Sequence, residues 1–160
     1  MKPQKNLEII KQAILNEVEG YQFYKMYAEK VSSPEVKKTF MDIANEELDH
    51  VEYLKKLASN NEEENLKMAQ MEVPKPGIFK FSNLTPAELS LAMAAFSIAT
   101  KMEDDSQKFY GEAAAKAETE EEKALFKKLQ EWEISHRDAF EAKYLELKDD
   151  WWADNAFAPF

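Results

Sequence analysis

Residues 45–50 read NEELDH and residues 132–136 read WEISH, and both stretches contain the pattern Glu-x-x-His. The chain has two histidines, His50 and His136, and each stands three residues after a glutamate. Residues three positions apart share one face of an α-helix, so each pair sets a carboxylate beside an imidazole. The pattern therefore predicts two helices that each present a matched pair of metal-binding side chains.

These two stretches belong to a longer internal repeat. A single shift of 86 positions, which carries Glu47 onto Glu133, aligns the first half of the chain with the second half without a gap. The other matched pairs are Glu17 with Glu103, Phe23 with Phe109, Tyr24 with Tyr110, Ala28 with Ala114, Phe40 with Phe126, Ile43 with Leu129 and His50 with His136. A repeat of this length predicts two helical hairpins that are built alike.

The composition indicates an all-α protein. Glycine and proline number only 3 and 6, while the helix-favouring residues alanine, leucine, glutamate and lysine are abundant. We therefore expect a four-helix bundle made of two repeated hairpins, 5–59 and 86–148. A long crossover over residues 60–85 would join the hairpins, and an aromatic tail would follow over residues 149–160.

Capping residues define where the predicted helices begin. Ser33 is an N-cap followed by proline, and Thr85 and Glu88 form a capping box that is also followed by proline at the first helical position. Thr119 is the expected cap of the last helix. With the apolar spacing, these signals predict helices over residues 5–30, 34–59, 86–116 and 119–148.

The Glu-x-x-His pairs lie on faces that the sequence predicts to be buried, because Phe40, Ile43 and Leu54 share the face of Glu47 and His50. Four buried glutamates, two from each hairpin, would repel one another and favour protonation. Two divalent cations would balance the four carboxylates, and two neutral imidazoles would complete the set of ligands without adding charge. The repeat thus predicts a site for two metal ions.

A second interpretation is that the glutamates and histidines form solvent-exposed pairs, which a glutamate-rich chain produces by chance. A single Glu-x-x-His would be weak support for a metal site. Here both pairs share the offset that aligns Glu17 with Glu103, and all three candidate ligands of each half are kept in the other. This favours the metal site.

The motifs resemble those of the ferritin-like di-iron carboxylate superfamily, and within it the rubrerythrin and bacterioferritin type. The patterns E-x-x-G-Y-x-F-Y at residues 17–24 and E-x-x-H at residues 47–50 are similar to rubrerythrin. The resemblance implies that Glu47 and Glu133 bridge two metal ions, with the other ligands terminal. The implied ligand set is Glu17, Glu47, His50, Glu103, Glu133 and His136.

Tyr24 and Tyr110 lie seven residues after Glu17 and Glu103, two turns along the same helix face. Their hydroxyls there would orient the metal-binding carboxylates in a supporting catalytic role, although packing in the apolar core is an equally good interpretation.

Two features depart from rubrerythrin. The chain has no cysteine, so it lacks the rubredoxin-like domain of that family, and this implies an external electron-donor protein. Ser106 stands where rubrerythrin has an additional glutamate, so the six-ligand set is more similar to that of bacterioferritin.

The resemblance implies a redox protein that reduces H2O2 or O2 at two iron ions, with manganese as the other metal suited to these ligands. A ferroxidase or iron-storage protein and a non-catalytic metal-binding module are the alternatives. The formal charge of −10 argues against nucleic acid and anionic membranes as partners. We expect a cytoplasmic homodimer, and the long crossover allows its protomers to exchange hairpins.

Overall fold

The computed structural model describes residues 6–59, 62–74 and 79–155, and over these residues its regular elements are all helices. The long helices are α1 (Leu7–Lys30), α2 (Pro34–Ala58), α4 (Pro86–Lys116) and α5 (Glu120–Asn155), and the short helix α3 (Glu62–Gln70) follows α2. The predicted all-α four-helix bundle is confirmed.

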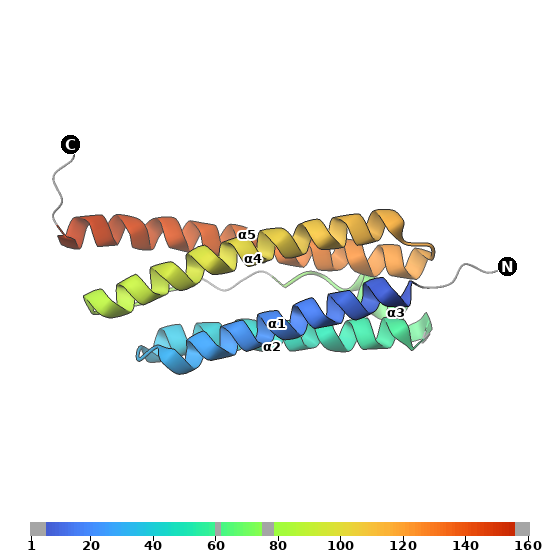
Figure 1. Cartoon of the computed structure of the whole chain (residues 1–160), viewed down its shortest axis with the longest axis horizontal. Helices are drawn as coiled ribbons and strands as arrows, with labels where there is room; N and C mark the ends of the chain where they lie inside the picture. The colour runs from blue at the N-terminus through green and yellow to red at the C-terminus, as the bar shows by residue number, and fades with distance from the viewer. Residues whose placement is uncertain (1–5, 60–61, 75–78, 156–160) are drawn as a thin grey trace.

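The bundle consists of two antiparallel hairpins, α1 with α2 and α4 with α5, which lie against each other along their length (Figure 1). Helix α2 ends at the end of the bundle where α1 begins, whereas α4 begins at the opposite end (Figure 1). The chain between them therefore crosses the length of the bundle, and this crossover sets the two hairpins in a pseudo-twofold relation.

The helix starts follow from local capping. The Ser33 hydroxyl accepts a hydrogen bond from the Val36 backbone N–H, and Thr85 and Glu88 form both bonds of a capping box. Thr119 directly precedes α5, and its hydroxyl accepts a hydrogen bond from the Glu122 backbone N–H. Such caps satisfy backbone groups that have no partner within the helix, and each contributes about 1 kcal/mol.

The crossover predicted over residues 60–85 contains a short helix, α3, which was not predicted from the sequence. Glutamate, lysine and methionine favour helix, and Asn65 and Met68, three residues apart, are both buried. Met68 packs in an apolar cluster with Leu57 of α2 and Leu125 of α5. Packing of this face against the two long helices stabilises the short helix.

The predicted end of the last helix near Lys148 was also wrong, because α5 continues through both tryptophans to Asn155. No glycine or proline interrupts residues 120–155, and Trp151 packs against the apolar cluster that contains Phe140. The aromatic segment therefore extends α5 as far as Asn155. The rest of the tail, including Phe157 and Phe160, lies outside the described residues.

Two apolar clusters fill the bundle, one on each side of its middle. Tyr24 and Phe40 belong to the first cluster, with their rings stacked at 6.2 Å between centroids and an interplanar angle of 22°. Their counterparts in the repeat, Tyr110 and Phe126, belong to the second, stacked at 6.1 Å and 27°. The internal repeat thus extends to side-chain packing, and polar residues occupy the space between the clusters.

Candidate metal centre

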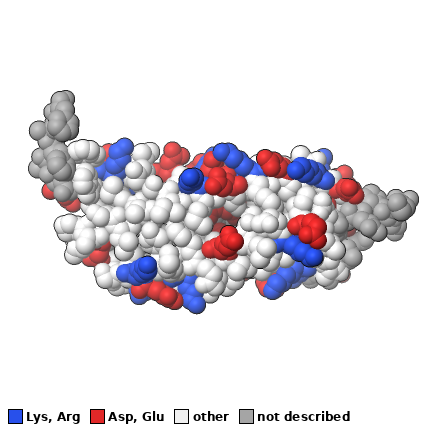
Figure 2. Space-filling view, in the orientation of Figure 1, with Lys and Arg blue, Asp and Glu red and all other residues white. Residues whose placement is uncertain are grey.

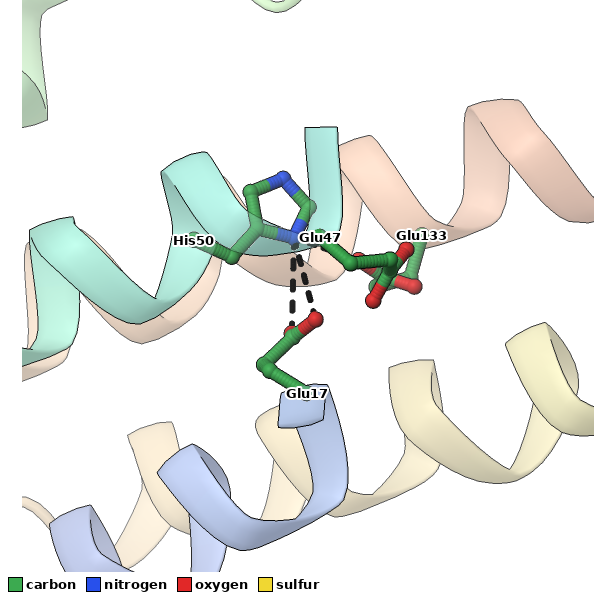
Figure 3. A group of neighbouring side chains, drawn as sticks. All are labelled: Glu17, Glu47, His50 and Glu133. Carbon is green, nitrogen blue, oxygen red and sulfur yellow. Dashed lines mark hydrogen bonds and ion pairs between the residues drawn. The ribbon is translucent and has the colours of Figure 1, made fainter. Parts of the chain in front are cut away.

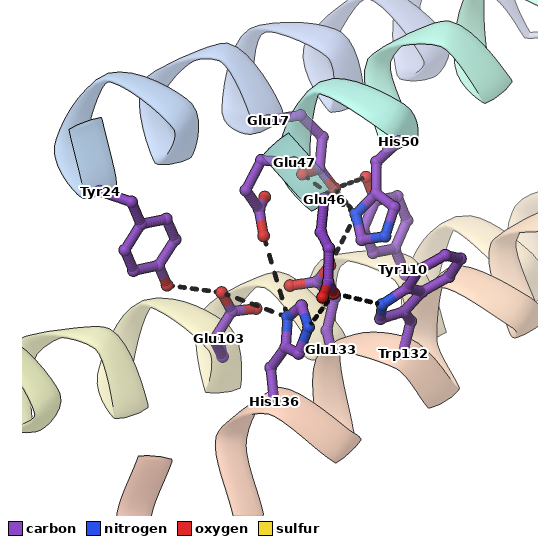
Figure 4. A network of polar contacts seen from close by, with 10 residues as sticks. All are labelled: Glu17, Tyr24, Glu46, Glu47, His50, Glu103, Tyr110, Trp132, Glu133 and His136. Atoms are coloured by element: carbon purple, nitrogen blue, oxygen red, sulfur yellow. Dashed lines mark hydrogen bonds and ion pairs between the residues drawn. The ribbon is translucent and has the colours of Figure 1, made fainter. Parts of the chain in front are cut away.

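Four carboxylates and two imidazoles meet in the middle of the bundle, between the two apolar clusters. Figure 4 shows how these side chains point toward one another. Helices α1 and α4 each contribute one glutamate, while α2 and α5 each contribute a glutamate and a histidine. None of the six residues is more than 3% exposed, and they are Glu17, Glu47, His50, Glu103, Glu133 and His136. The structure thus brings together all six residues of the predicted ligand set.

The six residues form two overlapping groups, each suited to one metal ion. Within each group, one potential ligand atom from every residue lies within 4.8 Å of the others. Glu17 and His50 belong to the first group alone (Figure 3), Glu103 and His136 to the second alone, and the two remaining glutamates to both. This sharing is what the bridging roles predicted for Glu47 and Glu133 require, and those roles stay predictions.

Both imidazoles point Nδ1 toward the cluster of carboxylates. Nδ1 of His50 lies 3.4 Å from Glu17 and 3.0 Å from Glu133 Oε1. Nδ1 of His136 lies 3.9 Å from Glu103 Oε1 and 4.0 Å from Glu47 Oε1. The two histidines therefore offer the same ring nitrogen to the centre, one from each side.

Each hairpin supplies a tyrosine that braces a glutamate of the other hairpin (Figure 4). The Tyr24 hydroxyl donates to Glu103 Oε1 at 2.6 Å, and the Tyr110 hydroxyl donates to Glu17 Oε1 at 2.5 Å. The sequence placed each tyrosine on the same helix face as one glutamate, but its hydrogen-bond partner is the equivalent glutamate across the bundle. Each tyrosine therefore has both expected roles, since its ring packs in an apolar cluster and its hydroxyl orients a carboxylate.

Burial and mutual repulsion dominate the electrostatics of the centre. Burial, together with the charges of Glu133 and Glu17, raises the pKa of Glu47 well above its usual value, and burial with the charge of Glu17 raises that of Glu133. Burial lowers the pKa of His50, but Glu17 and Glu133 outweigh this and raise it to about 10. Without metal, the cluster therefore holds protons that a bound cation would displace.

Several buried atoms at the centre lack a hydrogen-bond partner. Among the described residues these atoms are Glu47 Oε1, His50 Nε2, Glu103 Oε2, both carboxylate oxygens of Glu133, and His136 Nδ1, together with Asn65 Oδ1 away from the centre. Glu133 Oε1 lies 3.0 Å from His50 Nδ1 as an ion-pair contact that does not have the geometry of a hydrogen bond. Buried polar atoms are seldom left unpaired, because an unpaired group costs about 1–3 kcal/mol. The unpaired oxygens of the three glutamates and the unpaired nitrogen of His136 form a donor set that fits divalent cations such as iron or manganese.

Two polar neighbours of the centre, Glu46 and Trp132, were not predicted from the sequence. Glu46 Oε2 accepts a hydrogen bond from the Trp132 indole N–H at 3.0 Å and lies 2.6 Å from His136 Nε2. Burial raises the pKa of Glu46, but the contacts with His136 and Trp132 outweigh it and hold this pKa below its usual value. The repeat could have pointed to both residues, because the shift of 86 positions aligns Glu46 with Trp132, directly before the two Glu-x-x-His pairs.

A cavity of about 230 Å³ opens between α1 and α4 and reaches Glu47 and Glu133. Gly20 lines it, and a Cβ atom there would lie 3.2 Å from Glu47 Oε2, so glycine leaves room for this carboxylate. The exposed side chains of Glu19 and Asp105 lie at the outer end. Figure 2 shows acidic residues on both sides of a hollow in this face.

The bundle and its centre define a class of proteins, in which four helices hold metal between carboxylates and imidazoles. The Rubrerythrin family matches residues 8–144 of this chain. The chain therefore belongs to the rubrerythrin family, within the ferritin-like di-iron superfamily. Its buried cluster of glutamates and histidines fits the di-iron site of that superfamily.

A hypothetical protein from Pyrococcus furiosus has a similar structure, with a TM-score of 0.61 and 26% sequence identity over 89% of each chain. No curated protein matches the chain. None of the helices in the described ranges has both the length and the apolar character that crossing a membrane requires.

Proposed function

We propose that this protein holds two iron ions in the buried centre and reduces H2O2, or O2, with electrons from a separate donor protein. The observation that carries the proposal is the convergence of buried carboxylates and imidazoles from four helices at one point, where several of their oxygen and nitrogen atoms lack a hydrogen-bond partner. Membership of the rubrerythrin family supports it. When bound, a ferrous pair supplies two electrons, which together with two protons reduce H2O2 to two molecules of water.

The side chains of the centre have separate tasks in this proposal. The carboxylates and the two imidazoles bind metal, and the Tyr24 and Tyr110 hydroxyls hold the terminal carboxylates in place. The apolar clusters exclude water from the two sides of the centre along the bundle, which strengthens the electrostatic interactions there. The cavity beside Gly20 gives a small oxidant a path to Glu47 and Glu133.

In this proposal the electrons come from a separate protein. The chain contains no cysteine, so it cannot bind an iron–sulfur cluster through thiolates. A one-electron donor protein that delivers two electrons per turnover is therefore part of the proposal.

A ferroxidase is the second candidate, because acidic side chains stand at the outer end of the cavity. Glu19 and Asp105 would attract Fe²⁺ more than neutral H2O2. In this alternative iron is the substrate, and the oxidised ion leaves the centre. Size-exclusion chromatography separates the homodimer that we expect, with or without exchanged hairpins, from the hollow multi-subunit shell that storage requires.

The first test is an anaerobic Fe²⁺ titration of metal-free protein, followed by H2O2 or air, with near-ultraviolet absorbance as the readout. We expect saturation at two ions per chain and a ferric absorbance after the oxidant is added. The double variant Glu47→Ala with His136→Ala should lose both signals. Glu52→Ala is the control, since Glu52 is exposed on the same helix as Glu47 and pairs with Lys55.

Repeated cycles of reduction and peroxide consumption with the iron retained support the peroxidase. Release of ferric iron after one oxidation supports the ferroxidase. Binding of two ions without any spectral change on exposure to oxidant supports a non-catalytic metal-binding module. Failure of the wild type to bind two ions, or binding that survives the double substitution, contradicts the metal centre.

A further inference from the structure

The two imidazoles of the centre meet different surroundings at their outer ring nitrogen, Nε2. Nε2 of His136 lies 2.6 Å from Glu46 Oε2, at hydrogen-bond distance from a carboxylate. Nε2 of His50 is buried and has no hydrogen-bond partner. The His50 ring instead meets Trp132 edge to face, with 4.5 Å between ring centroids. The outer nitrogen of His136 thus meets a carboxylate, whereas that of His50 has no hydrogen-bond partner.

The repeat explains this difference. Glu46 and Trp132 occupy equivalent positions in the two halves, each directly before the glutamate of a Glu-x-x-His pair. Each crosses the bundle to the histidine of the other hairpin, so Glu46 meets His136 while Trp132 meets His50 (Figure 4). This difference between the repeat copies therefore gives the two histidines unlike surroundings.

Glu46 is held in this position by two groups. Its Oε2 atom also accepts the Trp132 indole N–H at 3.0 Å, so the same oxygen serves both partners. The side chain is 33% exposed and borders a second hollow, of about 370 Å³, on the side of the bundle that is lined by α2 and α5. The carboxylate is thus fixed against His136 and reached by solvent at its other edge.

A carboxylate at the outer nitrogen of a histidine changes how the ring binds metal. The ring donates its Nε2 proton to the carboxylate, so the lone pair of the other nitrogen is free for a cation, and the basicity of the ring rises. His136 has this arrangement, with Nδ1 directed at Glu47 and Glu103. His50 has no carboxylate at its outer nitrogen.

We propose that Glu46 is a positioning residue that strengthens metal binding at the His136 side of the centre alone, so that the two metal positions are unequal. This inference rests on the proposed metal-binding function. Glu46, which is not one of the six ligands, would make the affinities of the two metal positions differ.

The test is a titration of metal-free full-length protein with Co²⁺, followed by calorimetry and by the visible absorbance of the bound ion. Wild type should bind two ions. Glu46→Gln keeps the size of the side chain and removes its charge, and it should weaken one of the two binding steps by about 10–100-fold while leaving the other unchanged. Glu52→Gln, an exposed substitution on the same helix, should change neither step.

Double-mutant cycles identify which position is affected. In a His50→Ala background, Glu46→Gln should still weaken the remaining binding step, because His136 is present. In a His136→Ala background, Glu46→Gln should have no further effect, because the ring that Glu46 positions is gone. If Glu46→Gln does not fold, Glu46→Asp takes its place, and its shorter carboxylate should weaken the same step.

The outcomes separate the inference from the function on which it rests. A wild type that binds no Co²⁺ contradicts the metal centre itself. A wild type that binds two ions, with equal loss at both steps in Glu46→Gln or with no loss, overturns the role of Glu46 alone. An effect that persists in the His136→Ala background overturns it as well.

Discussion

The α1–α2 hairpin and the α4–α5 hairpin are two copies of one design that agree at the metal centre and differ around it. Both copies keep a buried glutamate on the first helix, Glu-x-x-His on the second, and a tyrosine stacked on a phenylalanine. The copies differ where Glu46 is matched by Trp132 and Gly20 by Ser106. The six buried ligand candidates are thus arranged nearly symmetrically. The residues that contact the histidines from outside, and those that line the cavity, differ between the two halves.

The agreement has a physical reason. Two adjacent cations need similar donor sets, and a single unbalanced carboxylate at such depth would be costly. The neighbours that touch only one side of the centre are not bound by this requirement. Paired substitutions at equivalent positions in the two hairpins can therefore separate what is shared from what is particular to one side.

The largest effect should come from the two shared glutamates. Glu47→Gln and Glu133→Gln each remove a charge from both groups of ligands. Each substitution should therefore lower the affinity for both ions by about 100-fold or more, and leave fewer than two ions bound per chain. Metal analysis after dialysis against Fe²⁺ or Mn²⁺ measures this. Loss of a single ion, with the second bound as in wild type, would show that these residues do not bridge.

The second-largest effect should come from Tyr24 and Tyr110, each of which bonds a glutamate of the other hairpin. Tyr24→Phe and Tyr110→Phe each remove one hydroxyl that bonds a buried carboxylate of the other hairpin, which costs about 1.5–3 kcal/mol in the free energy of unfolding. Urea unfolding of the two metal-free variants compares the two braces directly. Equal losses fit the symmetric geometry, whereas a loss confined to one variant would contradict it.

A pH effect on the metal-free protein should follow. The pKa of His50 is raised to about 10, so its stabilising contribution is fully present below its unfolded value of 6.5 and is lost as the pH rises through about 10. The raised pKa values of Glu47 and Glu133 act with the same sign.

The free energy of unfolding should therefore fall between pH 6.5 and pH 10, as measured by urea unfolding at several pH values. The slope should be shallower in His50→Gln. A stability that is constant over this range, or that rises with pH, would be inconsistent with a protonated His50 held between carboxylates.

The smallest effect should come from the two small residues beside the cavity. Gly20→Ala places a Cβ 3.2 Å from Glu47 Oε2, so this carboxylate has to move by a few tenths of an ångström. We expect metal affinity to fall by about threefold, which corresponds to less than 1 kcal/mol. Ser106→Ala, at the equivalent position of the other half, should leave affinity unchanged, and the same titration measures both.

Much of the fold and of the candidate site follows from local rules, and these could be predicted from the sequence. Ser33, Thr85 and Thr119 cap helices through hydrogen bonds to residues three positions away. Glu47 and His50 share a face for the same geometric reason. The repeat then placed the second Glu-x-x-His pair without further information, because one spacing rule applies to both halves.

The tertiary structure alone decided the contacts between hairpins. The spacing of Tyr24 relates it to Glu17 on its own helix, yet its hydroxyl bonds Glu103, and Glu46 reaches His136 in the opposite half. Helix α3 likewise depends on the surfaces against which Met68 packs. Periodicity states which residues share a face, but only the arrangement of the helices in space states which other face they meet.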